Sequence, residues 1–244
     1  TAVKAGGAEE SLPPVVYWTF LGNSFGSMAF ATFNSMVALV FLYLYNWGAT
    51  EIGMFLFTNG VINIFWAVQS RKILEKLSVP GIKGLEYIRG IVFSVILTGA
   101  YLGAYSYITN GVMQFVFMAL VLPLGMAIKQ PTYSQIVGVT VPLQFRGRAN
   151  GIISSANSVG NGLVPFVAGP LFLSDVFKQK YEYGEFSHLI YVIAVVLCAL
   201  EGLNAWFILR PAVLRAAAKS RDSDVEVSNK GVGEQTVELT VVAE

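Results

Sequence analysis

The stretch GIVFSVILTGAYLGAYSYITNGVMQFVFMALVLPLGMAI, residues 90–128, contains no Lys, Arg, Asp or Glu. A helix needs about 20 mostly apolar residues to cross the hydrocarbon core of a membrane, so this stretch is too long for a single crossing. Thr109, Asn110 and Gly111 form a turn signal. The stretch therefore predicts two consecutive membrane-spanning helices, over residues 90–108 and 111–128.

Similar charge-free gaps occur on both sides of this stretch, at residues 11–50, 52–70 and 149–174. The whole chain is 55% hydrophobic and only 13% charged, whereas an average soluble domain is about 25% charged. One such gap would fit a buried helix of a soluble protein, but a series of them in 244 residues indicates a membrane bundle. The predicted fold class is an all-α integral membrane protein.

The gaps and the polar segments between them predict six helices, over residues 14–45, 52–70, 90–108, 111–128, 149–173 and 188–209. A short turn covers residues 46–51, and polar connectors cover residues 71–89 and 129–148. An outer loop covers residues 174–187. The membrane domain is expected at residues 14–215, between a polar N-terminal segment (1–13) and a polar tail (216–244).

Lysine and arginine predict the orientation of these helices, because cytoplasmic loops carry an excess of both. One side of the predicted bundle has 14 of the 16 basic residues, and the other side has only Lys178 and Lys180. Both ends of the bundle are therefore expected on the cytoplasmic side, which an even number of spans satisfies. The sequence does not indicate which membrane holds the protein.

Other classes of function find little support in the sequence. Cys198 is the only cysteine and His188 the only histidine, so neither a disulfide framework nor a multi-histidine metal centre is expected. There is no phosphate-binding glycine loop and no Ser-His-Asp set. The net charge of +1 gives no general attraction to nucleic acid. We expect no enzyme activity and no cofactor.

The start of the chain suggests that it is part of something larger. The first residue is Thr1 rather than methionine, and residues 1–14 lack the basic start and apolar core of a signal peptide. We therefore expect a processed product or a part of a longer chain.

The passage VPLQFRGRANGI (141–152), followed by a helix rich in Gly, Ser and Pro, is the most distinctive of the sequence. It resembles the loop before the eleventh helix, and that helix itself, in transporters of the major facilitator superfamily. WGATEIG (47–53) resembles the outer turn between the seventh and eighth helices of that family. QSRK (69–72) with EKL (75–77) resembles its basic cytoplasmic loop in a degenerate form. The resemblance covers residues 14–215 and implies the carboxy-terminal six-helix half of a twelve-helix transporter.

The resemblance implies that the first and fourth helices line a solute cavity, which lies near the membrane midplane between two halves. Intramembrane polar side chains are candidates for such a cavity, and here they are Asn23, Ser27, Asn34 and Gln114. Asn23 and Ser27 are four residues apart and share a helix face. The alternative for these side chains is hydrogen bonding between helices of the same half.

The resemblance also implies that the second and fifth helices flank the contact between the two halves, and that the third and sixth lie outside. Asn59 and Asn63 in the second helix are four residues apart, as are Asn157 and Asn161 in the fifth. These four are expected at that contact, and packing is the favoured interpretation. Gly and Ser recur at four-residue spacing in the fifth helix, which lets helix backbones approach closely.

Glu201 is the only carboxylate well inside a predicted span. A carboxyl that is buried without a cationic partner holds its proton more tightly, which is the property that a proton-coupled carrier uses. Glu201 is therefore a candidate proton site, although the nearby Arg210 and the outer position of the sixth helix argue against that role.

Three arginines are candidates for a cytoplasmic gate or for setting the topology: Arg71, Arg146 and Arg148. The last two lie where the family keeps basic residues at the cytoplasmic mouth. They would either cap helix carbonyls or simply enforce the orientation.

The resemblance implies a secondary active transporter, half of an alternating-access carrier. Because no strong charge lies in the first and fourth predicted helices, we expect a small neutral or amphipathic solute. The alternative is an accessory subunit with a transporter fold that serves a larger membrane complex without transport of its own. Expected partners are membrane lipid, the solute, and a second six-helix half in the same polypeptide, in a separate chain or in a homodimer.

Overall fold

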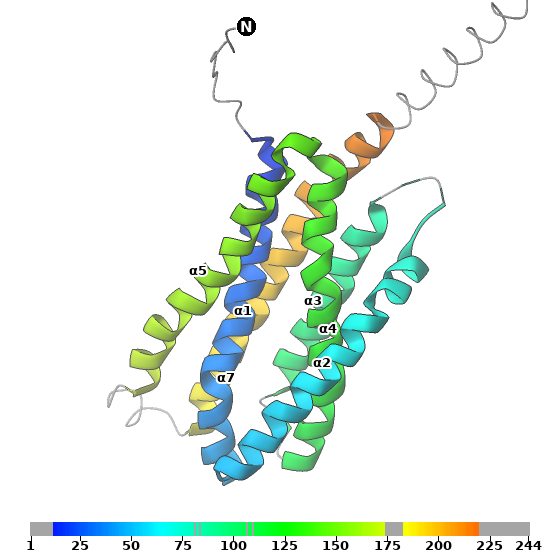
Figure 1. Ribbon diagram of the computed structural model, residues 1–244. Coiled ribbons are helices and arrows are strands. Elements are labelled where there is room, and N and C mark those ends of the chain that lie inside the picture. Colours follow the sequence, from blue (N-terminus) through cyan, green and yellow to red (C-terminus); the bar gives the residue numbers. More distant parts are fainter. Residues whose placement is uncertain are drawn as a thin grey trace, which may run out of the picture.

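The computed structural model describes residues 12–80, 82, 84–105, 107–108, 110–173 and 183–219. Within these residues six long helices form one bundle (Figure 1). They are α1 (Pro14–Leu44), α2 (Ala49–Leu77), α3 (Leu85–Tyr105), α4 (Gly111–Thr140), α5 (Arg146–Leu173) and α7 (Tyr183–Leu203). A short 3-10 turn, η1 (Leu143–Phe145), precedes α5, and α7 continues into a π-helical segment, η2 (Asn204–Leu209).

In the described part of the chain, four helical stretches are long and apolar enough to cross a membrane: Ala49–Leu77, Leu85–Ala104, Gly111–Thr140 and Tyr191–Lys219. Helices suit this environment because every backbone polar group finds its partner within the segment. No β-strand occurs in the part of the chain that the structure describes, where Val79 and Ile82 form a single isolated bridge. The structure thus supports an all-helical integral membrane protein.

The predicted connector over residues 129–148 is wrong. Helix α4 continues to Thr140 and contains both Pro123 and Pro131. Lys129 ended the charge-free gap in the sequence, but in the structure it lies inside α4 and is buried. The basic residues counted on the cytoplasmic side therefore include one that is buried inside the bundle.

Other helices also extend beyond their predicted bounds. Helix α2 runs to Leu77 and α3 starts at Leu85, so the predicted connector over residues 71–89 is much shorter than expected. Charged side chains can extend from a helix end into the polar interface, so they do not mark where the helix stops. Helix α5 likewise starts at Arg146, three residues early.

The last helix is longer than predicted at both ends. It begins at Tyr183 and includes His188, and its helical residues continue through Pro211 to Lys219. Residues 1–11, 174–182 and 220–244 lie outside the described residues, and so do most of the predicted N-terminal segment, outer loop and tail.

The segment η2 lies just before Pro211. Proline has no N–H to donate and its ring crowds the preceding turn, and here the N–H of Arg210 bonds to the carbonyl of Ala205, five residues back. The buried residues on this side of the helix are spaced four apart: Glu201, Ala205, Leu209 and Val213. In an α-helix, each four-residue step overshoots a full turn by about 40°. The wider π turns keep these side chains on one line.

Helix α1 is packed mainly between α5 and α7, whereas α3 contacts α4 and α7, and α2 lies against α4. Figure 1 shows α2 and α5 at opposite flanks of the bundle. Two groups of buried apolar side chains hold it together. One, near the carboxyl end of α1, includes Phe33, Phe41 and Tyr101. The other, near the amino end of α1, includes Val16, Ile88, Ile136, Leu209 and Val213.

The contact between α1 and α5 depends on one glycine. A Cβ atom placed on Gly160 would lie 2.7 Å from the backbone carbon of Ser27 and 2.9 Å from the nitrogen of Met28. Because these are backbone atoms of a helix, they cannot move aside singly. A Cβ on Gly162, two residues along, would meet nothing within 4 Å.

We therefore predict that Gly160→Ala forces α5 away from α1 and lowers the free energy of unfolding by about 1–3 kcal/mol, the usual effect of overpacking. The matched control Gly162→Ala should leave stability unchanged or slightly raise it, since alanine is the better helix former. Both can be measured in detergent by the reaction of a fluorogenic maleimide with Cys198, the single and buried thiol, during heating. Equal melting temperatures for the two variants would contradict this packing.

Candidate functional site

The candidate site is a buried ion pair between α4 and α7, in the middle of the bundle. Lys129 lies on α4 between Leu122 of the first apolar cluster and Tyr133 of the second. Glu201 lies on α7 between Cys198 and Ala205, which belong to the same two clusters. Both ends of the pair are thus closed off by apolar side chains.

The pair is closely formed. The Nζ atom of Lys129 lies 3.1 Å from Oε1 and 3.2 Å from Oε2 of Glu201. The hydroxyl of Tyr133, one turn further along α4, donates to Oε1 at 2.7 Å. The Lys129 and Glu201 side chains are only 6% and 2% exposed, so water contributes little to their solvation.

Helix α1 covers the pair with its backbone. A Cβ atom on Gly26 would overlap the Lys129 ammonium and the Glu201 carboxylate, and one on Gly22 would overlap the side-chain amide of Asn204. The two glycines are four residues apart and lie on one helix face. Only glycine lets α1 come this close to the charged groups.

Asn204, at the start of η2, completes the cluster. Its Nδ2 donates to the backbone carbonyl of Trp18 at 2.9 Å, which ties α1 to the last helix one turn from the ion pair. Its Oδ1 is buried and has no hydrogen-bond partner among the described residues. An unsatisfied buried acceptor is unusual, and here it lies in a π-helical segment, a deviation often found at functional sites.

A buried ion pair contributes little net stability, because removing two charges from water costs about as much as their attraction returns. Removing one partner, however, leaves the other charge buried and unpaired. In the described part of the chain, Lys129 and Glu201 are the only buried side chains that carry a charge. The pair therefore fixes which helices must stay together.

Glu201 was a candidate proton site on the premise that it has no cationic partner, and this premise is wrong because Lys129 pairs with it. Lys129 and Tyr133 were missed, because Lys129 was assigned to a connector. One signal was present in the sequence: Lys129 follows the apolar run 121–128, and apolar residues resume at helical spacing with Ile136 and Val137. That pattern would have kept the helix continuous across the lysine.

The predicted cavity residues of α1 contact α5 within the same bundle. Asn23 donates to the backbone carbonyl of Ile153 at 3.1 Å, and Ser27 donates to Oδ1 of Asn157 at 2.6 Å. Both are buried. Asn34 lies on the exposed surface. These contacts agree with the alternative of hydrogen bonding between helices for Asn23 and Ser27.

Gln114 of α4 also bonds within the bundle. It is completely buried, and its Nε2 donates to the hydroxyl of Tyr101 on α3 at 3.2 Å. Its Oε1 has no partner among the described residues. The structure therefore places Gln114 in the contact between α3 and α4.

The four asparagines predicted at a contact between halves fall into two groups. Asn59 and Asn63 are half-buried and lie on the same side of α2 as the buried Phe55, which faces the bundle. Asn157 and Asn161 of α5 are exposed.

The three arginines have different surroundings. The Nε of Arg146 donates to the carbonyl of Val141 at 3.0 Å, so it caps the end of α4. Arg71 is exposed on α2 and forms an ion pair with Glu75. Arg148 is exposed.

A double-mutant cycle tests the pair. We predict that Lys129→Met and Glu201→Gln each lower the free energy of unfolding by about 3–5 kcal/mol, because each leaves an uncompensated polar or charged group in the bundle. The double variant should recover most of the loss. Tyr133→Phe, which removes one hydrogen bond, should cost about 1–3 kcal/mol. Melting in detergent measures all four, and strictly additive single losses would contradict the direct pairing.

Comparison of the chain with protein-family models, with curated proteins and with solved structures finds no match.

Proposed function

We propose that this chain is one half of an alternating-access solute carrier, in which all six long helices cross the membrane. The observation that carries the proposal is the Lys129–Glu201 pair at mid-bundle. Ionisable side chains inside a membrane are expensive and usually mark the path of an ion, a proton or a solute. A bundle with a purely structural role gains little from a buried ion pair, because apolar side chains of similar volume would stabilise it equally well.

The proposed orientation puts both ends of the described chain on the cytoplasmic side. The Pro14 end of α1 and the helical residues 210–219 lie at the same end of the bundle (Figure 1). The exposed basic residues Arg71, Lys72 and Lys76 lie in the last two turns of α2, toward that end. Cytoplasmic loops and the helix ends near them favour such residues.

The second half of the carrier is proposed to dock on the outer face of α5. Gly151, Ser154, Ser158 and Gly162 are exposed there, and a Cβ on either glycine would meet nothing within 4 Å. Small residues let helix backbones approach closely inside a membrane. This face supports the arrangement that the resemblance to the major facilitator superfamily implies, with α5 at the contact between two halves.

The ion pair is proposed as the coupling element. While Glu201 is charged, the side chains of Lys129 and Tyr133 link α4 to α7. When Glu201 takes up a proton, its attraction to the Lys129 ammonium is lost, and the two helices are freed to shift. Gly22 and Gly26 leave α1 without a side chain at the two positions where the pair and Asn204 approach it, so these positions do not obstruct such a shift.

The solute is proposed to be neutral or amphipathic. The expectation that the first and fourth helices carry no strong charge was wrong, so the proposal needs another reason. Helix α4 does carry a charge, Lys129, but Glu201 neutralises it. Among the described residues no buried charge is left unpaired. A strongly charged solute would therefore find no unpaired buried counter-charge among these residues.

A second candidate function, an accessory subunit of a larger complex, is supported by a different observation. Asn23, Ser27 and Gln114 all form hydrogen bonds to neighbouring helices of the bundle. Their polar groups therefore hold the bundle together and are not presented to a solute.

The test is transport in proteoliposomes that contain the purified full chain with whatever half co-purifies. A panel of sugars, polyols, zwitterionic amino acids and amphipathic amines is applied to a solid-supported membrane, and currents are compared with and without an inward proton gradient. We predict a current for one neutral or amphipathic class. The double variant Lys129→Met/Glu201→Gln should retain solute exchange and lose accumulation driven by the proton gradient.

Gly138→Ala on α4, where an added Cβ atom would meet nothing within 4 Å, is the matched control for handling and should transport normally. If no class gives a current above empty liposomes, and the chain is recovered in a fixed ratio with a large assembly, the accessory-subunit function replaces the carrier.

A further inference from the structure

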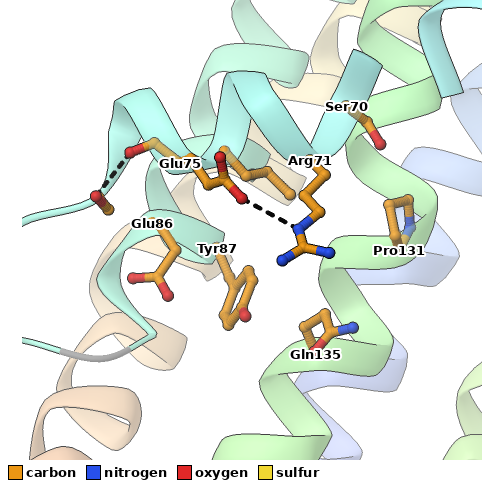
Figure 2. A pocket seen from close by; sticks show the side chains of 9 residues that line it. Ser70, Arg71, Glu75, Glu86, Tyr87, Pro131 and Gln135 are labelled. Atoms are coloured by element: carbon orange, nitrogen blue, oxygen red, sulfur yellow. Dashed lines mark hydrogen bonds and ion pairs between the residues drawn. The ribbon is translucent and has the colours of Figure 1, made fainter. Parts of the chain in front are cut away.

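A cavity of about 500 Å³ opens between the ends of α2, α3 and α4, away from the ion pair. Its size falls in the usual range of small-molecule sites, about 300–1,000 Å³. Arg71 and Glu75 of α2, Glu86 and Tyr87 of α3, and Pro131 and Gln135 of α4 line it. Figure 2 shows Arg71, Tyr87 and Gln135 gathered around the same space.

The cavity holds charges of both signs. The Nε of Arg71 contacts Oε1 of Glu75 at 3.1 Å, and the two side chains are 89% and 63% exposed. Such an exposed pair contributes little stability and rearranges easily. Among the described residues, the terminal guanidinium nitrogens of Arg71 have no other partner. Glu86 uses one oxygen, Oε2, to accept from the N–H of Gly84 at 2.9 Å.

An apolar stripe leads along α2 to this charged group. Phe57, Val61, Ile64 and Val68 are between 51% and 74% exposed. Their spacing of four, three and four residues places them on one helix face, and the next positions of the series are Arg71 and Glu75. From Phe57 to Val68 the helix rises about 16 Å, which is about half of the 30 Å hydrocarbon thickness. The stripe thus spans about one leaflet.

We propose that this cavity binds the headgroup of a phospholipid that carries both a phosphate and a primary ammonium, of the phosphatidylethanolamine class, with an acyl chain along the α2 stripe. The planar guanidinium of Arg71 matches a phosphate geometrically and electrostatically. The ammonium, with three N–H donors, reaches the carboxylates of Glu75 and Glu86. The ring of Tyr87 offers it an additional cation–π contact.

The same chemistry discriminates against other headgroups. A quaternary ammonium, as in phosphatidylcholine, has no N–H to donate to the two carboxylates. An anionic headgroup without an amine leaves both carboxylates unpaired next to its own negative charge. The lining residues carry one cation and two carboxylates, so they favour a ligand with a positive group of its own.

The test uses the full chain equilibrated with vesicles that contain equal parts of dioleoyl phosphatidylethanolamine, phosphatidylcholine and phosphatidylglycerol. Lipids retained on the purified protein are counted by native mass spectrometry. We expect phosphatidylethanolamine to be enriched in the bound lipid relative to the vesicles. Equal retention of the three lipids, or enrichment of phosphatidylglycerol, would overturn the proposal. This comparison requires no variant and therefore does not depend on a mutant that folds.

Variants then locate the site. Arg71→Gln and Glu86→Gln should each weaken retention of phosphatidylethanolamine about tenfold or more, the loss expected for one charge-assisted hydrogen bond. Lys72→Gln removes a cation from the next position of α2, outside the cavity lining, and should leave retention unchanged. Loss in Lys72→Gln as large as in Arg71→Gln would show general attraction to the basic surface, and that result would reject the cavity.

The lipid chain is tested separately from the headgroup. Water-soluble glycerophosphoethanolamine carries the same phosphate and ammonium but no acyl chains, so it should displace the lipid only at concentrations at least about 100-fold higher, since burial of each CH₂ group on the stripe adds affinity. Displacement at equal concentration would show that the site takes a soluble phosphate ester, and the lipid assignment would fail.

Discussion

A charge in the middle of a membrane bundle must meet an opposite charge there, and the packing of three helices follows from this constraint. Lys129 and Glu201 come from helices that are far apart in the sequence, and they meet at 3.1 Å. Helix α4 must therefore remain helical through Pro131 to bring Tyr133 onto the same carboxylate. Helix α1 must carry glycine where it passes over the pair. None of these features would be needed around an apolar core.

The remaining buried polar side chains divide according to their chemistry. Most hydroxyls satisfy themselves within their own helix by donating to a carbonyl one turn back, as Thr19, Ser24 and Thr32 do, a common arrangement for Ser and Thr in helices. Amides have more donors and acceptors than such a local bond can use, so Asn23, Gln114 and Asn204 bond between helices. Amides and the ion pair, more than hydroxyls, determine which helices are neighbours.

Much of the fold could be predicted from the sequence because apolar length alone marks a membrane helix. The charge-free runs located the cores of the first five long helices, and an apolar run interrupted by Glu201 located the sixth. The Asn110 turn correctly separated α3 from α4. Helix ends were less predictable, because charged side chains occur on helices well beyond the apolar run. The one charge that lies deep inside, Lys129, was misassigned for this reason, and with it half of the candidate site.

The pairing of side chains was predictable only in part. Spacing showed that Asn23 and Ser27 share a face, but which helix that face meets depends on the arrangement of the bundle, which no local pattern encodes. Likewise 72 residues separate Lys129 from Glu201, and nothing in either local sequence points to the other. The available signal was indirect: the sequence has one lysine and one glutamate inside apolar runs, and buried charges of opposite sign are expected to pair.

The π-helical turns before Pro211 act as a phase correction in the last helix. Because they bring Glu201, Ala205, Leu209 and Val213 into line, the segments before and after them are rotated relative to a continuous α-helix. A π turn holds about one residue more than an α-helical turn, so loss of a single residue within Asn204–Leu209 would return this segment to α-helix and leave Val213 on the buried face. Loss of a residue from an α-helical part of the same helix would instead rotate everything downstream by about 100°. In evolutionary terms this stretch is where the last helix can lose one residue without turning the segment that follows it, whereas the α-helical parts on either side must keep their length.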